Sequence, residues 1–226
     1  MAASLKNAKK KIKAGEYELT SAMTPVEVLN ILIEGRVKRY FVTIPEGYNI
    51  KEIAAAIENA GLAKKEEFLK LAFDKNFAKS LGFKGFEGYL FPDTYQFTKT
   101  AGAEEIIKKM TGRFLQVYDA EFRALAEGKG LGMKEIVTLA SIIEKESGNA
   151  SEMPRVSAVF WNRLKKRMPL QSDPTVIYGI NDFDGNLTRA HLKQPTPYNT
   201  YVKFGLPPTP IANPGKAAMD AALNPA

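Results

Sequence analysis

The sequence contains no cysteine and only one histidine, His191, in its 226 residues. These absences exclude zinc sites built from cysteine and histidine, cysteine nucleophiles and iron–sulfur clusters. A Ser-His-Asp triad would have to use His191, which we interpret as an incidental surface or packing residue. Acid–base chemistry must therefore rest mainly on carboxylates, tyrosines or lysines, and we expect neither a metal site nor a cofactor.

Long hydrophobic runs are also lacking, because no segment approaches the roughly 20 apolar residues that cross a bilayer. Hydrophobic residues make up 45% of the chain and charged residues 25%, which excludes disordered and fibrous proteins as classes. A chain of this length corresponds to one or two domains and can bury a substantial core. As given, the sequence predicts a soluble globular chain.

Acidic residues are missing from the first fifteen positions, which hold Lys6, Lys9, Lys10, Lys11 and Lys13. The net charge of +7 depends mostly on this end, since the rest of the chain has 27 basic against 25 acidic residues. A basic end on a near-neutral body does not indicate a nucleic-acid groove, so we expect no nucleic acid partner. We interpret residues 1–13 as a solvated tail or as the flank of a removed segment.

Hydrophobic periodicity predicts four short elements in the first third of the chain. They are a strand over residues 15–19, a helix from Pro25 to Gly35, a strand over 36–44 and a helix over 49–59. Ser21 or Thr24 can cap the first helix, and Pro25 suits its first position. This β-α-β-α stretch has the size of a small module, and a linker helix over residues 64–73 follows it.

The rest of the chain is predicted to be mainly helical, with a loop-like end. After a glycine-rich, aromatic segment, the predicted elements are an extended stretch over 89–97 and helices over 103–127, 134–147 and 151–167. Eight prolines lie between Pro169 and Pro214, which argues against long regular elements there. An extended, proline-stiffened segment of this kind is usually functional or wraps a core.

The helix over residues 134–147 carries a candidate acid, Glu146. At 100° per residue, Glu146 shares a face with Leu139, Ile142 and Ile143, which predicts at least partial burial. It also lies in the last turn, near the negative end of the helix dipole. Both features favour the protonated carboxyl group that a general acid needs. The alternative is a Glu146 that pairs with a buried arginine or lies on an exposed helix end, and the helix alone favours this alternative.

Two later segments are rich in hydrogen-bonding groups. Gln171, Ser172 and Asp173 precede an apolar, strand-like run, and Tyr198 and Asn199 lie between two prolines and a second tyrosine. Amides, hydroxyls and aromatic faces suit carbohydrate, although each segment alone is also typical of an ordinary turn. Glu87 is a second candidate carboxylate, because the glycine beside it would let a ligand approach the backbone.

Together these residues belong to stretches that resemble the endolytic murein transglycosylases of the YceG-like (MltG) family. The similar stretches are EGYLFPDTY at 87–95, ASIIEKES at 140–147, VFWNRL at 159–164, LQSDPTVIYG at 170–179, PYNTY at 197–201, GLPP at 205–208 and IANPG at 211–215. They occur in the order typical of the family and cover most of the chain from about residue 13. Their combination is highly specific, although no single stretch is.

The resemblance implies an α+β fold. A small LysM-like β-α-β-α module over residues 14–80 would precede a mainly helical, lysozyme-like catalytic domain over residues 81–226, with a proline-rich extended C-terminal part. It also implies a single-pass protein of the bacterial inner membrane whose catalytic domain faces the periplasm or the cell exterior. The N-terminal membrane helix is missing here, and the family continues past Pro225, so we expect a fragment with a truncated catalytic domain.

The resemblance also implies a reaction. The family cleaves the β-1,4 bond between N-acetylmuramic acid and N-acetylglucosamine within peptidoglycan glycan strands and leaves 1,6-anhydro ends, acting as a terminase of nascent chains beside peptidoglycan synthases. The second glutamate of the EKES motif is the catalytic one, which places that role on Glu146. The substrate-binding residues carried over or expected from the loops are Glu87, Ser147, Gln171, Ser172, Asp173, Tyr198 and Asn199. We expect the side chains of all but Ser147 to converge on Glu146.

Two alternatives use the same residues differently. A muramidase would hydrolyse the same bond with water and would need a second carboxylate, such as Glu87 or Asp173. A non-catalytic peptidoglycan-binding module would bind glycan without turnover, whether or not Glu146 is intact. Anhydro product ends would distinguish the transglycosylase from the muramidase.

Overall fold

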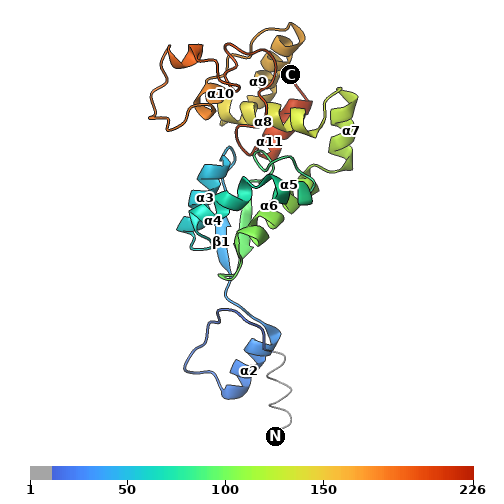
Figure 1. The fold of residues 1–226 in the computed structure, drawn as a ribbon. Helices are drawn as coiled ribbons and strands as arrows, with labels where there is room; N and C mark the ends of the chain where they lie inside the picture. Colours follow the sequence, from blue (N-terminus) through green and yellow to red (C-terminus); the bar gives the residue numbers. More distant parts are fainter. Residues whose placement is uncertain (1–11) are drawn as a thin grey trace.

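The computed structural model describes residues 12–226, which are arranged as three units along one direction, with helix α2 at one end (Figure 1). The expected basic tail over residues 1–13 therefore lies almost entirely outside the described residues. No helix within residues 12–226 has the length and apolar character needed to cross a membrane.

The first unit is built around α2 (Pro25–Glu34), and its predicted ends are confirmed. Thr24 and Glu27 form a capping box, and Gly35 ends the helix with a positive φ of 72°. The strand predicted over residues 15–19 is wrong, because this segment has no strand partner and makes only isolated contacts such as the bond from the Lys38 N–H to the Glu16 carbonyl (2.7 Å). No residue of α2 is buried.

The second unit contains the two-stranded antiparallel sheet, in which Tyr40 faces Phe97 and Thr43 faces Thr94. Its elements are β1 (Tyr40–Thr43), α3 (Ile50–Asn59), α4 (Lys65–Ala72), α5 (Lys75–Ser80), β2 (Thr94–Phe97) and α6 (Ala103–Val117). Helix α3 packs against α4, and α4 packs against α6. Burial alternates along β2, where Tyr95 and Phe97 point into the core.

The boundary predicted at residue 80 does not separate two cores. Strand β1 lies before this position and its partner β2 lies after it. One hydrophobic core runs from Val42 to Leu223. Residues 14–80 therefore do not form a module with its own core, because β1 would lose its partner at that cut. The α+β class is confirmed, while the LysM-like character stays a prediction.

The third unit is helical and centres on α8. Its elements are α7 (Ala120–Gly128), α8 (Met133–Glu146), α9 (Met153–Lys165), α10 (Asp173–Tyr178), η1 (His191–Lys193) and α11 (Lys216–Leu223). Every residue of α8 from Ile136 to Ile143 is buried, and α11 packs against both α8 and α9. Helix α8 is thus the central core element of this unit.

Three predictions for the second half of the chain need correction. The single helix expected over residues 103–127 is two helices, because the Asp119 carboxylate accepts from the Phe122 N–H (2.9 Å) and caps α7 after α6 has ended. The apolar run after Asp173, expected to be strand-like, is helix α10, which has Pro174 in its first turn. The C-terminal part is not extended throughout either, since α11 is a buried helix.

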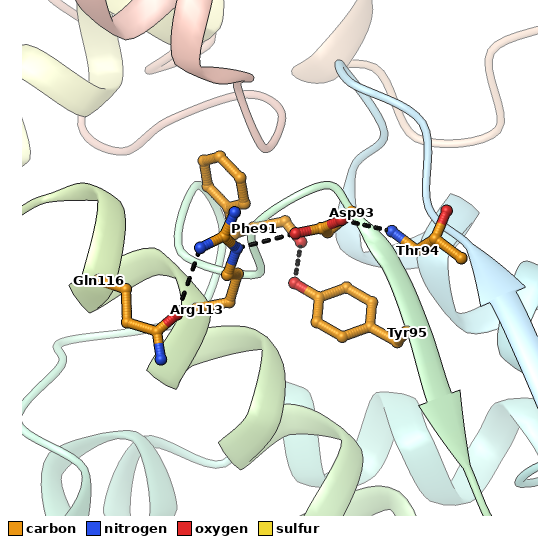
Figure 2. Close-up of polar contacts among 6 residues, drawn as sticks. All are labelled: Phe91, Asp93, Thr94, Tyr95, Arg113 and Gln116. Atoms are coloured by element: carbon orange, nitrogen blue, oxygen red, sulfur yellow. Dashed lines mark hydrogen bonds and ion pairs between the residues drawn. The ribbon is translucent and has the colours of Figure 1, made fainter.

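The motif at residues 91–95 has a structural role at the start of β2 (Figure 2). The Tyr95 hydroxyl donates to the Phe91 carbonyl (2.5 Å), and Arg113 of α6 donates from Nε to the Asp93 carboxylate (2.8 Å). The Arg113 guanidinium also lies over the Phe91 ring, 5.8 Å from its centroid. These contacts join the turn before β2 to α6.

Candidate functional site

Glu146 is the last residue of α8, at the point where the helix leaves the core. Ser147 follows with extended backbone, and its N–H closes the helix on the Ile143 carbonyl (3.0 Å). The expected burial of Glu146 is wrong, because its residue is exposed. Ile142 and Ile143 lie one turn earlier on the same face of α8, and the core covers them. In the last turn of the helix this face is exposed to solvent.

A hollow of about 260 Å³ lies beside Glu146. Its apolar wall is made by Val156, Val159 and Phe160 of α9, together with Leu170. Its polar side is made by Glu146, Arg163 and Gln171. The hollow therefore joins a carboxylate, a guanidinium and an amide to an apolar surface, which is the mixture that a polar ligand with methyl groups requires.

Ser172 orients the Glu146 carboxylate. Its hydroxyl donates to Glu146 Oε1 over 2.6 Å, and the serine itself is fully buried. Its backbone is held in turn, since the Ser172 N–H donates to the Thr200 hydroxyl (3.0 Å) and the Gln171 N–H donates to the Thr200 carbonyl (3.0 Å). A buried, anchored donor fixes the position of one carboxylate oxygen. Among residues 12–226 no hydrogen bond is made to the other oxygen, Oε2.

Arg163 holds the segment that contains Gln171. One of its nitrogens, Nη1, donates to the Leu170 carbonyl (2.5 Å) and to Gln171 Oε1 (3.1 Å). Gln171 has a positive φ of 53°, a backbone conformation that a residue with a side chain rarely adopts. Such strain persists only where the surroundings impose it, and it is often found at functional sites.

Asp173 lies next to this segment, at the start of α10, and is bound by Tyr201. The Tyr201 hydroxyl donates to Asp173 Oδ1 (2.6 Å). This hydrogen bond, together with burial, raises the pKa of Tyr201 to about 12. Tyr201 therefore stays a donor at any physiological pH.

Glu87 forms a second polar centre, where three parts of the chain meet. Its carboxylate accepts from the Ile50 N–H (3.2 Å), the Tyr178 hydroxyl (2.9 Å) and Asn213 Nδ2 (3.1 Å). Burial raises the pKa of Glu87 to about 7, although the bonds from Tyr178 and Ile50 oppose the rise. Glu87 and Tyr178 line a cavity of about 410 Å³, whose wall also includes Lys51.

The structure separates the predicted site residues into groups. Ser172 contacts Glu146 directly and Gln171 lines the same hollow. Tyr198 lies nearer to the Glu87 centre: its ring packs on Tyr178 at 4.8 Å between centroids. The roles of Ser172, Gln171 and Tyr198 in substrate binding stay predictions.

Two other predicted residues direct their polar groups at loop backbone. Asn199 is fully buried, and its amide nitrogen donates to the carbonyls of Gln194 (2.7 Å) and Leu192 (3.1 Å). The Ser147 hydroxyl donates to the Asn149 carbonyl (3.2 Å). These bonds of the Asn199 amide hold the backbone at residues 191–194, and the expected convergence of its side chain on Glu146 stays a prediction.

Sequence reasoning missed the partners that organise both centres. No role in the site was expected for Arg163, and the contacts of Tyr178 and Asn213 with Glu87 join residues 91 and 126 positions apart. All three lie inside the motifs that carry the family resemblance, which is the signal that could have identified them.

In the described part of the chain, no group of three or more His, Cys, Asp or Glu side chains could hold a metal ion.

Comparison with known proteins agrees with the motifs. The model of the YceG-like family matches residues 1–226. A protein of Bacillus subtilis strain 168 named endolytic murein transglycosylase is 34% identical, and the match covers 94% of this chain and 64% of the relative. A protein of the same name from Streptococcus pneumoniae R6 is 30% identical, with 94% and 44% covered. The chain thus spans about half to two thirds of the curated relatives it matches.

A solved structure gives the same result for the fold. The crystal structure of a yceG-like protein from Listeria monocytogenes superimposes with a TM-score of 0.77 at 35% identity, over 100% of this chain and 80% of that one. Together, the matched family model, the relatives and the shared fold show that the chain belongs to the YceG-like family.

Proposed function

We propose that this chain carries the catalytic centre of an endolytic peptidoglycan lytic transglycosylase, with Glu146 as its acid and base. The observation that carries the proposal is the arrangement at the end of α8. An accessible carboxylate is oriented by a buried serine hydroxyl at 2.6 Å and borders a hollow of about 260 Å³. The relatives named endolytic murein transglycosylase support the same activity.

In this proposal Glu146 acts twice. As a carboxylic acid it gives its proton to the glycosidic oxygen, and the bond from that oxygen to the muramyl C1 breaks. The resulting carboxylate then removes the proton of the muramyl 6-hydroxyl while O6 bonds to C1, which closes the 1,6-anhydro ring and restores the acid. The hydroxyl of Ser172 donates to the carboxylate between these steps, which stabilises its ionised form.

One carboxylate is enough for this sequence, because the nucleophile belongs to the substrate. A muramidase would need a second carboxylate placed to activate water. The residues that line the Glu146 hollow include no other acid. Glu87 already accepts three hydrogen bonds, and Asp173 accepts one from Tyr201. This arrangement favours the transglycosylase over the muramidase.

The whole protein is proposed to act as a terminase of nascent strands, anchored in the inner membrane beside peptidoglycan synthases. We also propose that its LysM-like, glycan-binding unit is the one formed by β1, α3, α4 and β2, rather than residues 14–80. The pairing of β1 with β2 supports this shift.

The test is mass spectrometry of the fragments that the chain releases from purified sacculi. The Glu146→Gln variant should lose cleavage by at least about 100-fold, since it removes the acid–base group. Glu152→Gln, which changes another exposed glutamate, should keep activity, and both variants should unfold like the parent. Reducing ends would establish the muramidase, and binding without any product would establish the non-catalytic module.

A further inference from the structure

The Arg163 guanidinium has donors that the fold does not use. Its bonds to the carbonyls of Pro169 (3.4 Å) and Leu170 (2.5 Å) and to the Gln171 side chain all come from one nitrogen, Nη1. A guanidinium has five N–H donors on three nitrogens. Within residues 12–226, Nε and Nη2 make no hydrogen bond and no carboxylate lies within ion-pair distance of Arg163.

This cation lines the hollow that Glu146 also lines. Its Nη1 bonds hold the guanidinium in place, so that little side-chain freedom is lost when a ligand binds. Gln171 lies beside it and its amide is held by the same nitrogen. An acceptor that entered the hollow would thus meet a fixed fork of donors, which suits a carboxylate or an amide carbonyl.

Three apolar side chains of α9 line the hollow on the same side of the helix as Arg163. Val156, Val159 and Phe160 lie along one side of α9, and Val159 is 52% exposed. A volume of about 260 Å³ is small for a glycan strand but suits one substituent of a sugar ring. The occupant should therefore be short, with a methyl group and an acceptor close together.

We propose that this hollow receives the 3-O-lactyl substituent of N-acetylmuramic acid, with Arg163 and Gln171 at its carboxyl group and Val156, Val159 and Phe160 at its methyl group. The proposal rests on the proposed function, since it names what distinguishes the muramyl sugar beside Glu146. N-acetylglucosamine differs from N-acetylmuramic acid only in lacking this substituent. Arg163 is therefore a specificity-determining residue that selects muramyl strands over chitin.

The experiment measures binding in the Glu146→Gln background, so that no substrate is consumed. Two probes of equal length are compared by calorimetry: a peptide-free GlcNAc-MurNAc tetrasaccharide with free lactyl carboxylates, and chitotetraose. We expect the muramyl probe to bind at least about 10-fold more tightly, the lower end of the range for hydrogen bonds to a charged group. Adding Arg163→Gln should reduce this ratio severalfold, leaving only the part that the methyl contact contributes, and Arg163→Lys should restore part of the loss.

The ratio of the two affinities distinguishes a role of Arg163 in ligand recognition from a purely structural role. If Arg163 only held the segment at residues 169–171, its loss would weaken both probes alike and leave the ratio unchanged. Lys166→Gln removes a neighbouring charge outside the hollow and should also leave the ratio unchanged. Equal binding of both probes by the Glu146→Gln protein would overturn this inference alone. Failure to bind either probe, with no cleavage of sacculi by the parent chain, would overturn the proposed function as well.

Discussion

The raised pKa of Glu87 predicts that the stability of this protein falls as pH rises through neutrality. The carboxyl group of Glu87 accepts hydrogen bonds from Ile50 at the start of α3, Tyr178 of α10 and Asn213 before α11. Burial raises its pKa from 4.5 to about 7, so the folded protein holds the proton more tightly than the unfolded chain does. A group of this kind stabilises the fold below about pH 4.5, and its contribution is lost as pH rises to about 7.

The size of this effect follows from the same pKa values. A rise from 4.5 to about 7 corresponds to at most roughly 3 kcal/mol of unfolding free energy. The actual loss should be smaller, because part of the Glu87 residue remains in contact with solvent. Glutamine at this position keeps an acceptor for the Ile50 N–H and has no charge at any pH. The Glu87→Gln variant should therefore lose this part of the pH dependence.

The assay is urea unfolding of both proteins at intervals from pH 4.5 to pH 8. The unfolding free energy of the parent, relative to that of Glu87→Gln, should fall by about 1–3 kcal/mol across this range. Burial also raises the pKa of Glu144, but Glu144 is present in both proteins and cancels in the difference. Glu67→Gln, on the exposed side of α4, is the matched control and should follow the parent. A difference between parent and Glu87→Gln that stays constant with pH would refute the reasoning.

Two further predictions concern the active centre and the core. Ser172→Ala removes the hydroxyl that donates to Glu146. The kcat on sacculi should fall about 10- to 100-fold with little change in KM, because one hydrogen bond to a charged group contributes this much. An unchanged kcat would show that Ser172 does not orient the carboxylate. Gly88→Ala should destabilise the fold by more than about 1 kcal/mol, because Gly88 has a φ of +90° and an added Cβ would lie 2.5 Å from Pro210 Cγ and 2.8 Å from Val137 Cγ1. Thermal unfolding checks this, with Gly82→Ala as a control that shares the positive φ but has open space around it.

What could be predicted from the sequence depended on interactions between near neighbours. The ends of α2 follow from Thr24, Pro25 and Gly35, whose capping contacts span only a few residues. The same holds for α8, whose apolar face identified it as a core helix, and whose motif placed the candidate acid on Glu146. These properties are decided within one or two helical turns, so periodicity and capping residues reveal them.

The tertiary structure decided everything that joins distant parts of the chain. No local pattern pairs Tyr40 with Phe97, and this pairing removed the expected boundary at residue 80. The exposure of Glu146 depends on where α9 and the segment at residues 169–172 lie, not on the helix that carries it. The sequence alone determined which side chains have the chemistry of an acid, a donor or a cation. Only packing decides which of them share one hollow, because burial and hydrogen-bond partners are properties of the assembled surfaces.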